Sequence, residues 1–322
     1  MTEHLPSLNV YLKKLTGLRQ APTAYGPAPH KPVLLLTLFD GIEKGWITGN
    51  QVYLTPELVA AFRDHWSLLV DTAHSPEFTM PFFHLQREGF WRVVRHDGEP
   101  LQDFTKSLAR LQELVDYAAL DEPLYTLLLD PVTRNVLRVA LLDKYFPAKK
   151  VAYLHRDNQG GYLNDVENEV LGEPAVAYAA PEAEADEETA FVRGGLFKRL
   201  VPKVYNYACC ITGMRVISTY DVAMVDACHI VPIGRHGSDH VTNGLSLCPN
   251  LHRAFDRGLL SVDDNYRVLV SDAFGEVEGH PYSLRQLRGK PLTLPFDRKF
   301  YPGKDNLAWH QENLFKKNVT NS

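Results

Sequence analysis

The sequence predicts an α+β protein of two domains joined by an acidic linker. Its 322 residues are about twice the length of an average domain, which is enough chain for two separate cores. Hydrophobic residues make up 45% and charged residues 23%, and no apolar run approaches the roughly 20 residues of a membrane span. We therefore expect no membrane protein. Helical periodicity dominates the first half of the chain, whereas short strands precede a helix in the second.

The N-terminal domain, residues 1–163, is predicted to be mainly helical. Apolar residues recur at helical spacing from Leu8 to Leu18. Pro32 fits the first turn of a second helix whose buried face is 33–39, and a third helix begins after Thr55.

The rest of this domain mixes one β element with further helices. Pro81 interrupts the segment that follows, and an alternating pattern around a Glu88-Gly89 turn predicts a small β hairpin. Helical patterns then return near residues 104–118, 121–128 and 131–145.

Residues 164–190 form the predicted acidic linker. They hold nine acidic residues, no Lys or Arg, and many Ala and Pro, so they bury too little apolar surface to offset their ordering entropy. We expect one short strand near Val170. The chain's net charge of −5 divides into −1 for residues 1–163, −9 for the linker and +5 for residues 191–322. The basic C-terminal domain therefore suits a polyanionic partner.

The C-terminal domain, residues 191–322, opens with a basic helix over 191–207. Two strands are expected, one at CCITGMRV and one at VDACHIVPI, followed by a helix and a turn at PNLHRAFDRGLLSVDD. Four arginines of this domain are expected to contact DNA phosphates: Arg193, Arg199, Arg253 and Arg257.

The segment DACHIVPIGRHGSDHVTNGLSLCPNLHRAFDRG resembles the core of an HNH endonuclease, a ββα-metal fold in which two strands and a helix hold one divalent ion. The resemblance spans roughly residues 205–265. His229, Asn243 and His252 stand at the H, N and H positions, flanked by CxxTG, HIVP, NGLSLC and HxxFDxG elements. The resemblance implies a metal-dependent DNA endonuclease.

The chemistry of phosphodiester hydrolysis explains these residue types. His229 would be the general base, because a neutral imidazole takes a proton from water near pH 7. The resemblance implies that Asn243 braces the loop and orients His229. His252 and Asp256 are four residues apart, so on a helix they share a face and serve as ligands of one ion. Mg²⁺ or Mn²⁺, with Zn²⁺ as an alternative, would act there as a Lewis acid.

The cysteines mark a departure from the HNH pattern. Cys228 stands where many such sequences carry an acidic or histidine metal ligand, and a thiolate is a poor ligand for Mg²⁺. Asp226 is the alternative third ligand. A zinc site of Cys210, Cys228 and Cys248 is another reading, against a default of buried, reduced thiols. With no secretory signal at the N-terminus, the expected compartment is the cytoplasm.

Two motifs of the N-terminal domain, APHKPVLLLTL and MPFFHLQREGFWRV, resemble the sulfur-binding domain of type IV, modification-dependent restriction endonucleases. That domain reads phosphorothioate DNA. The resemblance implies that His30 and Lys31 approach the phosphorothioate and that Met80, Pro81 and His84 shape an apolar cup for sulfur. Lys31 stands where Arg is common and Met80 where Tyr is common, and lysine lacks the bidentate fork of arginine.

The sequence therefore predicts a modification-dependent endonuclease that reads double-stranded DNA, with phosphorothioate as the first candidate modification. A homodimer is expected at least on DNA, since cutting both strands needs two active sites or two encounters. Three alternatives stay open. The chain could read a methylated, hydroxymethylated or glucosylated base, it could be a non-specific nuclease, or it could be a catalytically degenerate DNA-binding protein.

Overall fold

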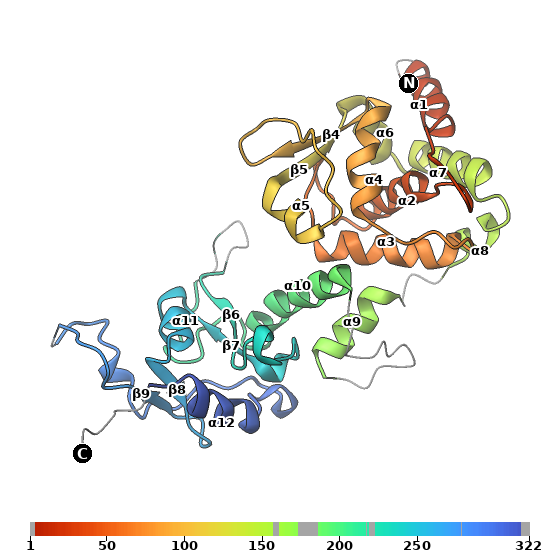
Figure 1. Ribbon diagram of the computed structural model, residues 1–322. Coiled ribbons are helices and arrows are strands. Elements are labelled where there is room, and N and C mark those ends of the chain that lie inside the picture. The colour runs from red at the N-terminus through yellow and green to blue at the C-terminus, as the bar shows by residue number, and fades with distance from the viewer. Residues whose placement is uncertain are drawn as a thin grey trace. The chain divides into compact units, whose positions relative to one another are not determined.

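The computed structural model describes residues 4–156, 161–172, 186–216, 218, 223–277 and 279–316, which divide into two compact units (Figure 1). The first unit runs to Val166 and includes the described residues from 186 to Val192. The second includes the described residues from Glu167 to 172 and the chain from Arg193 onward. Helices predominate and the sheets are small and antiparallel, which confirms the predicted α+β class. No helix among these residues is long and apolar enough to span a membrane.

The first unit is built mainly from helices around one three-stranded sheet. Its helices are α1 (His4–Thr16), α2 (His30–Glu43), α3 (Pro56–Leu69), α4 (Thr79–His84), α5 (Leu108–Leu114), α6 (Glu122–Leu129), α7 (Pro131–Tyr145) and α8 (Lys150–Leu154). Its strands are β1 (Pro22–Thr23), β2 (Gly26–Pro27), β3 (Gln51–Val52), β4 (Trp91–Arg95) and β5 (Val115–Leu120). The sheet order is β3-β5-β4, and β1 pairs with β2 as a separate ribbon.

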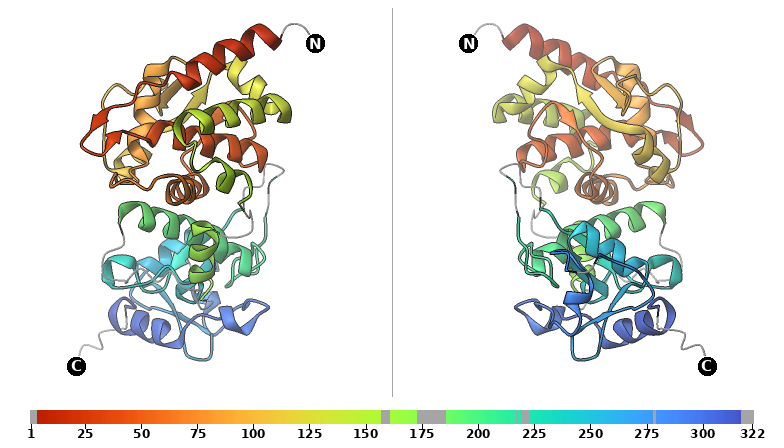
Figure 2. Two further views of the ribbon diagram at one scale, coloured as in Figure 1. Left: turned by 90° about the vertical axis from the view of Figure 1, so that its right-hand side faces the viewer. Right: turned by 90° about the vertical axis from the view of Figure 1, so that its left-hand side faces the viewer.

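Helix α2 is the centre of this unit. Every residue from His30 to Ile42 is buried, because α3, α4, α6 and α7 all pack against it (Figures 1 and 2). A helix that is apolar on nearly all sides is stable only when other elements cover those sides. Pro32 lies in its first turn as predicted, and Gly45, with φ of +76°, follows its end, where only glycine adopts a left-handed backbone without cost.

One buried carboxylate joins three helices to α2. Asp40 accepts a hydrogen bond from His65 of α3 at 3.0 Å and pairs with Arg138 of α7 and with Arg156, while Tyr153 of α8 donates to it. Burial alone would raise the pKa of this carboxyl, but the hydrogen bond from His65 and the charge of Arg156 outweigh it, and the pKa lies well below its usual range. The charge inside the helical core is thus fully compensated.

The predicted hairpin around Glu88-Gly89 is wrong. Its first half is α4, followed by a short 3-10 helix over Leu85–Glu88, and only β4 of the segment is a strand, paired with β5. Pro81 occupies the first turn of α4, where its missing N–H costs no hydrogen bond. The helix expected over 104–118 is likewise shorter, because α5 ends where β5 begins.

The second unit contains two small hairpins and a few helices. Strands β6 (Asp226–His229) and β7 (Gly244–Leu247) are antiparallel, and α11 (Pro249–Asp256) follows directly. Strands β8 (Leu260–Val262) and β9 (Val268–Val270) form the other hairpin, against which α12 (Lys304–Asn313) packs (Figure 2). The strand expected at CCITGMRV is wrong. Those residues form a turn in which Gly213 donates to the carbonyl of Cys209 at 2.8 Å.

The predicted acidic linker contains helix at both ends. Helix α9 (Tyr162–Val170) covers its start, so the strand expected near Val170 is wrong, and α10 (Glu187–Val204) covers its end. Within the second unit, Glu169 of α9 pairs with Arg193 of α10 at 2.6 Å. Acidic side chains of this segment thus have basic partners in the fold, which composition alone does not reveal. Residues 173–185 of the linker lie outside the described residues.

Candidate active site and DNA-binding surfaces

His229 is the last residue of β6, and two contacts fix its ring. Its Nε2 lies 3.0 Å from Oδ1 of Asp239, and the ring stacks on Phe197 of α10 with centroids 3.8 Å apart and planes 5° apart. Asp239 accepts the Nε2 proton, so Nδ1 is the nitrogen with a free lone pair in the neutral ring. The side chain keeps about a quarter of its surface exposed. A water molecule can therefore reach the ring.

Asn243 is buried and spans the loop between β6 and β7. Its Oδ1 accepts from the backbone N–H of Val231, and its Nδ2 donates to the carbonyls of Val231 and Ser238, each at 2.9 Å. Its own carbonyl accepts from Ile230 N–H at 2.8 Å. Every polar atom of the side chain is engaged with the loop that carries Asp239. The Asn243 side chain thus fixes the loop on both sides of Asp239, which is the partner of His229.

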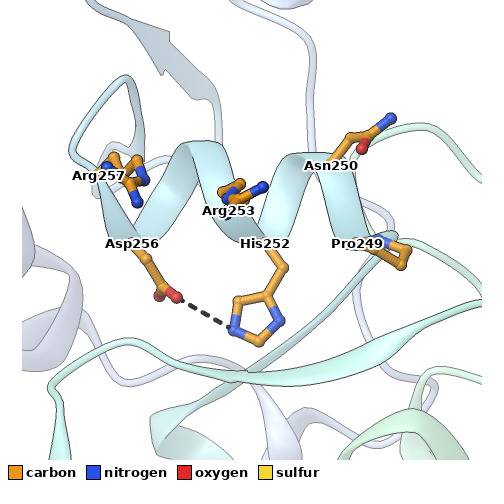
Figure 3. Close-up of a pocket in the computed structure, with 6 residues that line it drawn as sticks. All are labelled: Pro249, Asn250, His252, Arg253, Asp256 and Arg257. Atoms are coloured by element: carbon orange, nitrogen blue, oxygen red, sulfur yellow. Dashed lines mark ion pairs between the residues drawn. The ribbon is translucent and has the colours of Figure 1, made fainter.

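A cluster of donor groups lies between β6 and α11. His252 and Asp256 project from the same side of α11 toward each other, with Nε2 and Oδ2 3.5 Å apart (Figure 3). The other ring nitrogen of His252 lies 3.3 Å from Oδ2 of Asp226. Ligand atoms of Cys228, His252 and Asp256 all fall within 4.8 Å of one another, close enough to hold one metal ion.

The thiol of Cys228 forms a hydrogen bond within this cluster. It is fully buried, and its Sγ donates to Oδ1 of Asp256 at 3.7 Å. Burial, followed by the charge of Asp256, raises the pKa of this thiol well above its ordinary value, which disfavours the thiolate in the metal-free site. The imidazole of His252 and the carboxylate of Asp256 are donors that fit Mg²⁺ or Mn²⁺ and also Zn²⁺.

The alternative zinc site of Cys210, Cys228 and Cys248 is not assembled by the described residues. Among the described residues, the thiols of Cys210, Cys228 and Cys248 do not converge as a group of metal ligands, and all four cysteines are free. Instead, the thiols of Cys209 and Cys248 are near enough to each other that their interaction lowers the pKa of Cys209 and raises that of Cys248.

The predicted arginines fall into two groups. Arg253 and Arg257 are exposed and line an open pocket of about 570 Å³ along α11, together with His252 and Asp256 (Figure 3). Arg193 and Arg199 are engaged in ion pairs with Glu169 and Glu167 of α9. To contact DNA, Arg193 and Arg199 would have to exchange these glutamates for phosphates.

In the first unit, the residues predicted to approach a modified phosphate lie at the start of α2. His30 is buried, with Nε2 2.9 Å from the carbonyl of Ser75 and the ring 4.6 Å from that of Trp66. Burial lowers the pKa of His30, which keeps the ring neutral. Lys31 is also buried, and its ammonium forms an ion pair with Glu88 at the end of the 3-10 helix.

The predicted apolar residues lie on α4. Pro81 is buried and Met80 half-buried, while the ring of His84 stacks on Phe104 at 5.1 Å. Burial, together with the charges of Arg87 and Lys31, lowers the pKa of His84. Its Nδ1 is buried without a hydrogen-bond partner among the described residues. We use the name reading cup for the five residues that the sequence predicts to bind a modified phosphate: His30, Lys31, Met80, Pro81 and His84.

Three further residues were not predicted from the sequence: Asp239, Phe197 and Glu88. An acidic residue in the loop GSDHVTN is the one local signal that could have indicated Asp239. Phe197 and Glu88 carry no such signal, because each contacts its partner from a segment more than thirty positions away in the sequence.

A family model matches the segment that contains this site. Residues 209–263 match the family model described as HNH endonuclease. Among solved structures, the chain is similar to the modification dependent TagI restriction endonuclease, at 24% identity over 39% of each chain and a TM-score of 0.30. It thus spans well under half the length of that relative.

Two further similar structures are of proteins whose names refer to phosphorothioated DNA. The sulfur binding domain of ScoMcrA complexed with phosphorothioated DNA is 22% identical over 46% of this chain and 90% of that one, with a TM-score of 0.34. The type IV phosphorothioation-dependent restriction endonuclease ScoMcrA is 12% identical over 76% of this chain and 93% of that one, with a TM-score of 0.32. No curated protein matches the chain. From the family match and the β6-β7-α11 geometry around His229, Asn243 and His252, the second unit contains an HNH endonuclease domain.

Proposed function

We propose that this protein is a modification-dependent DNA endonuclease that reads phosphorothioate DNA through its first unit and hydrolyses phosphodiester bonds with its second. The observation that carries the proposal is the site on β6, β7 and α11. It holds a candidate general base, His229, oriented by Asp239, and a carboxylate and imidazole cluster at Asp256 and His252. These are the groups that metal-assisted phosphodiester hydrolysis needs.

The chain's own residues divide the chemistry as follows. Nδ1 of His229 takes a proton from the attacking water as the water oxygen bonds to phosphorus, and the bond from phosphorus to the 3′ oxygen breaks. Asp239 holds Nε2–H and so keeps Nδ1 in the accepting state. Asn243 keeps Asp239's loop in place. Arg253 and Arg257 bind neighbouring phosphates from the exposed side of α11.

His252 and Asp256 would hold a divalent ion, Mg²⁺ or Mn²⁺ with Zn²⁺ as the alternative, which as a Lewis acid would stabilise charge on the phosphate and the departing oxygen. His252 faces Asp256 through Nε2 and Asp226 through Nδ1. Nε2 would therefore be the nitrogen that binds the ion, and Asp226 would orient the ring by accepting the Nδ1 proton. In this proposal Asp226 is a positioning residue, in place of the direct ligand expected from the sequence.

The reading cup supports phosphorothioate as the modification. Sulfur is larger, more polarizable and less strongly hydrated than oxygen, so it favours a surface of apolar side chains and neutral rings. Met80 and Pro81 supply the apolar part, and His30 and His84 are rings whose pKa values are lowered. The solved domain named for sulfur binding is bound to phosphorothioated DNA, which identifies the first modification to test.

A homodimer on DNA remains part of the proposal, because one HNH site cuts one strand in each encounter. Sedimentation of the full chain with a duplex that carries sulfur on both strands should give two copies for each duplex. One copy for each duplex, with both strands cut in separate encounters, would contradict the dimer.

The experiment compares cleavage of otherwise identical duplexes that carry phosphorothioate, methylated, hydroxymethylated or unmodified sites, with Mg²⁺, Mn²⁺ and Zn²⁺ in turn. We expect cleavage of the phosphorothioate duplex, abolished by EDTA and reduced about a hundredfold or more by His229→Ala, as for loss of a general base. Preference for a methylated or hydroxymethylated duplex would replace phosphorothioate with that modification. Cleavage unaffected by His229→Ala would contradict the assignment of the base.

A further inference from the structure

The cation of the reading cup is already paired. Lys31 and Glu88 have side chains only 9% and 7% exposed, and the ammonium contacts Oε1 of Glu88 directly. The same oxygen accepts from the backbone N–H of Arg19 at 3.2 Å. A buried ion pair of this kind is held in a fixed geometry, since either partner alone would leave an uncompensated buried charge.

The other groups of the cup add no charge. Burial lowers the pKa values of His30 and His84, so both rings are neutral at pH 7, and Met80 and Pro81 are apolar. Because Glu88 cancels the charge of Lys31, the cup as a whole is close to neutral. Arg87, which is exposed on the same 3-10 helix, is a cation available to meet the DNA backbone.

An unpaired lysine at this place would favour the wrong substrate. A phosphate oxygen accepts a strong charge-assisted hydrogen bond from an ammonium, whereas sulfur is a weak acceptor. A free Lys31 would therefore stabilise an ordinary phosphate in the cup more than it stabilises a phosphorothioate. Both diesters carry one negative charge, but the ordinary phosphate is the more strongly hydrated of the two. A neutral cup therefore leaves a larger desolvation cost uncompensated for the ordinary phosphate.

We propose that Glu88 is a specificity-determining residue of the reading cup: by holding Lys31 in a buried ion pair, it denies ordinary phosphate the cation and so excludes unmodified DNA. This inference rests on the proposed reading of phosphorothioate DNA. It assigns Glu88 a role in discrimination rather than in affinity. Removal of its charge should therefore tighten binding of the wrong duplex.

The test measures binding of the full chain carrying His229→Ala, in EDTA, to two duplexes that differ by one sulfur atom. In this background Glu88→Gln should bind the unmodified duplex about tenfold more tightly, as expected for one freed charge-assisted hydrogen bond. Binding of the phosphorothioate duplex should change much less, so the ratio of the two affinities falls. The slope of log affinity against log salt for the unmodified duplex should steepen by about one phosphate contact.

Glu113→Gln is the matched control, because it makes the same change in net charge at an exposed carboxylate paired only on the surface with Arg110. It should leave the ratio unchanged. Lys31→Met added to Glu88→Gln should abolish the gain for unmodified DNA, which assigns the gain to the freed ammonium. If Glu88→Gln does not fold, Glu88→Asp, which keeps the charge but withdraws it from Lys31, should lower the ratio by a smaller factor.

The outcomes separate the two proposals. A parent protein that binds both duplexes equally contradicts phosphorothioate reading itself. A parent that prefers the phosphorothioate duplex, with a ratio that Glu88→Gln leaves unchanged or increases, overturns the role of Glu88 and leaves the reading of sulfur intact. A gain for unmodified DNA that survives Lys31→Met would equally overturn it.

Discussion

At His252, the two ring nitrogens face two different carboxylates, and this decides the role of Asp226. Nδ1 lies 3.3 Å from Asp226 and Nε2 3.5 Å from Asp256. Mutation of the residue that holds the other nitrogen of a metal-bound histidine commonly weakens metal binding by about 10- to 100-fold. Asp226→Asn should therefore weaken Mn²⁺ binding by about tenfold or more, measured by calorimetry on the full chain without DNA.

The control for Asp226 is Asp264→Asn, an exposed carboxylate in the turn between β8 and β9 that makes the same change in charge. It should leave Mn²⁺ affinity unchanged. Equal affinity for Mn²⁺ in the Asp226→Asn variant and the parent protein would remove the positioning role.

His310 of α12 makes the second unit sensitive to acid. It is fully buried, stacks on Phe255 at 3.8 Å, and bonds to Ser261 and to the carbonyl of Phe255. Burial lowers its pKa from 6.5 to about 4. Because the folded-state pKa is depressed, its stabilising effect is complete above about pH 6.5 and is lost as pH falls toward 4. The loss is about 3 kcal/mol in the free energy of unfolding.

Urea unfolding of the parent protein and of His310→Gln over this range measures the effect. The glutamine keeps a donor for the Phe255 carbonyl but binds no proton. The gap in stability between the two should therefore narrow as pH falls from 6.5 to 4. Parallel curves would show that His310 is not the group that titrates.

For single residues, the sequence predicts the contacts between positions that are close along the chain. His252 and Asp256 come together because four residues separate them on a helix, and that spacing is visible in the sequence. Asp239 reaches His229, and Glu88 reaches Lys31, only through loops and turns that bring distant segments together. The acidic residue in the loop GSDHVTN is a local signal for Asp239, but no local pattern indicates Glu88 as the partner of Lys31, so that pairing was found only in the fold.

Among the elements, α10 shows how a glycine's surroundings decide its role. Gly194 lies inside α10, its backbone is helical, and a Cβ added there would meet nothing within 4 Å. Gly194→Ala should therefore raise the free energy of unfolding by up to about 1 kcal/mol, through the higher helix propensity of alanine and the less flexible unfolded chain. Thermal unfolding followed by circular dichroism measures the change.

Gly244 of β7 provides the opposite case on the neighbouring element. A Cβ there would lie 2.5 Å from Val201 and 3.1 Å from the ring of Phe197, which stacks on His229. Gly244→Ala should lower stability by about 1–3 kcal/mol, as overpacking does, and should also slow cleavage. A gain in stability at Gly244, or a loss at Gly194, would contradict this account of the packing around α10.

The elements that were predicted correctly are those with strong end signals. Thr55 caps α3 with Pro56 in the first turn, and Asp130 caps α7 in the same way with Pro131. The hairpin prediction failed because the aromatic run at α4 matches a strand as well as a helix, and tertiary packing decided between them. Trp91 donates to the carbonyl of Phe82 at 2.8 Å, one of the tertiary contacts that α4 makes in its helical form.

Across the whole molecule, charge is distributed by unit. The surplus of +5 over residues 191–322 accompanies the HNH domain, while the acidic residues of 164–190 that are described take part in ion pairs and helix starts. Glu188, for example, accepts from the backbone N–H of Phe78 at 2.8 Å. The acidic segment is therefore partly structural, which its composition did not predict.

The most direct test of the proposed function follows cleavage of two duplexes in one tube, equal in concentration and sequence, of which one carries a single phosphorothioate. With Mn²⁺ or Mg²⁺, the full chain should cut the phosphorothioate duplex and spare the other, and His229→Ala should cut neither. Equal rates for the two duplexes, or cleavage of the unmodified duplex alone, would contradict it.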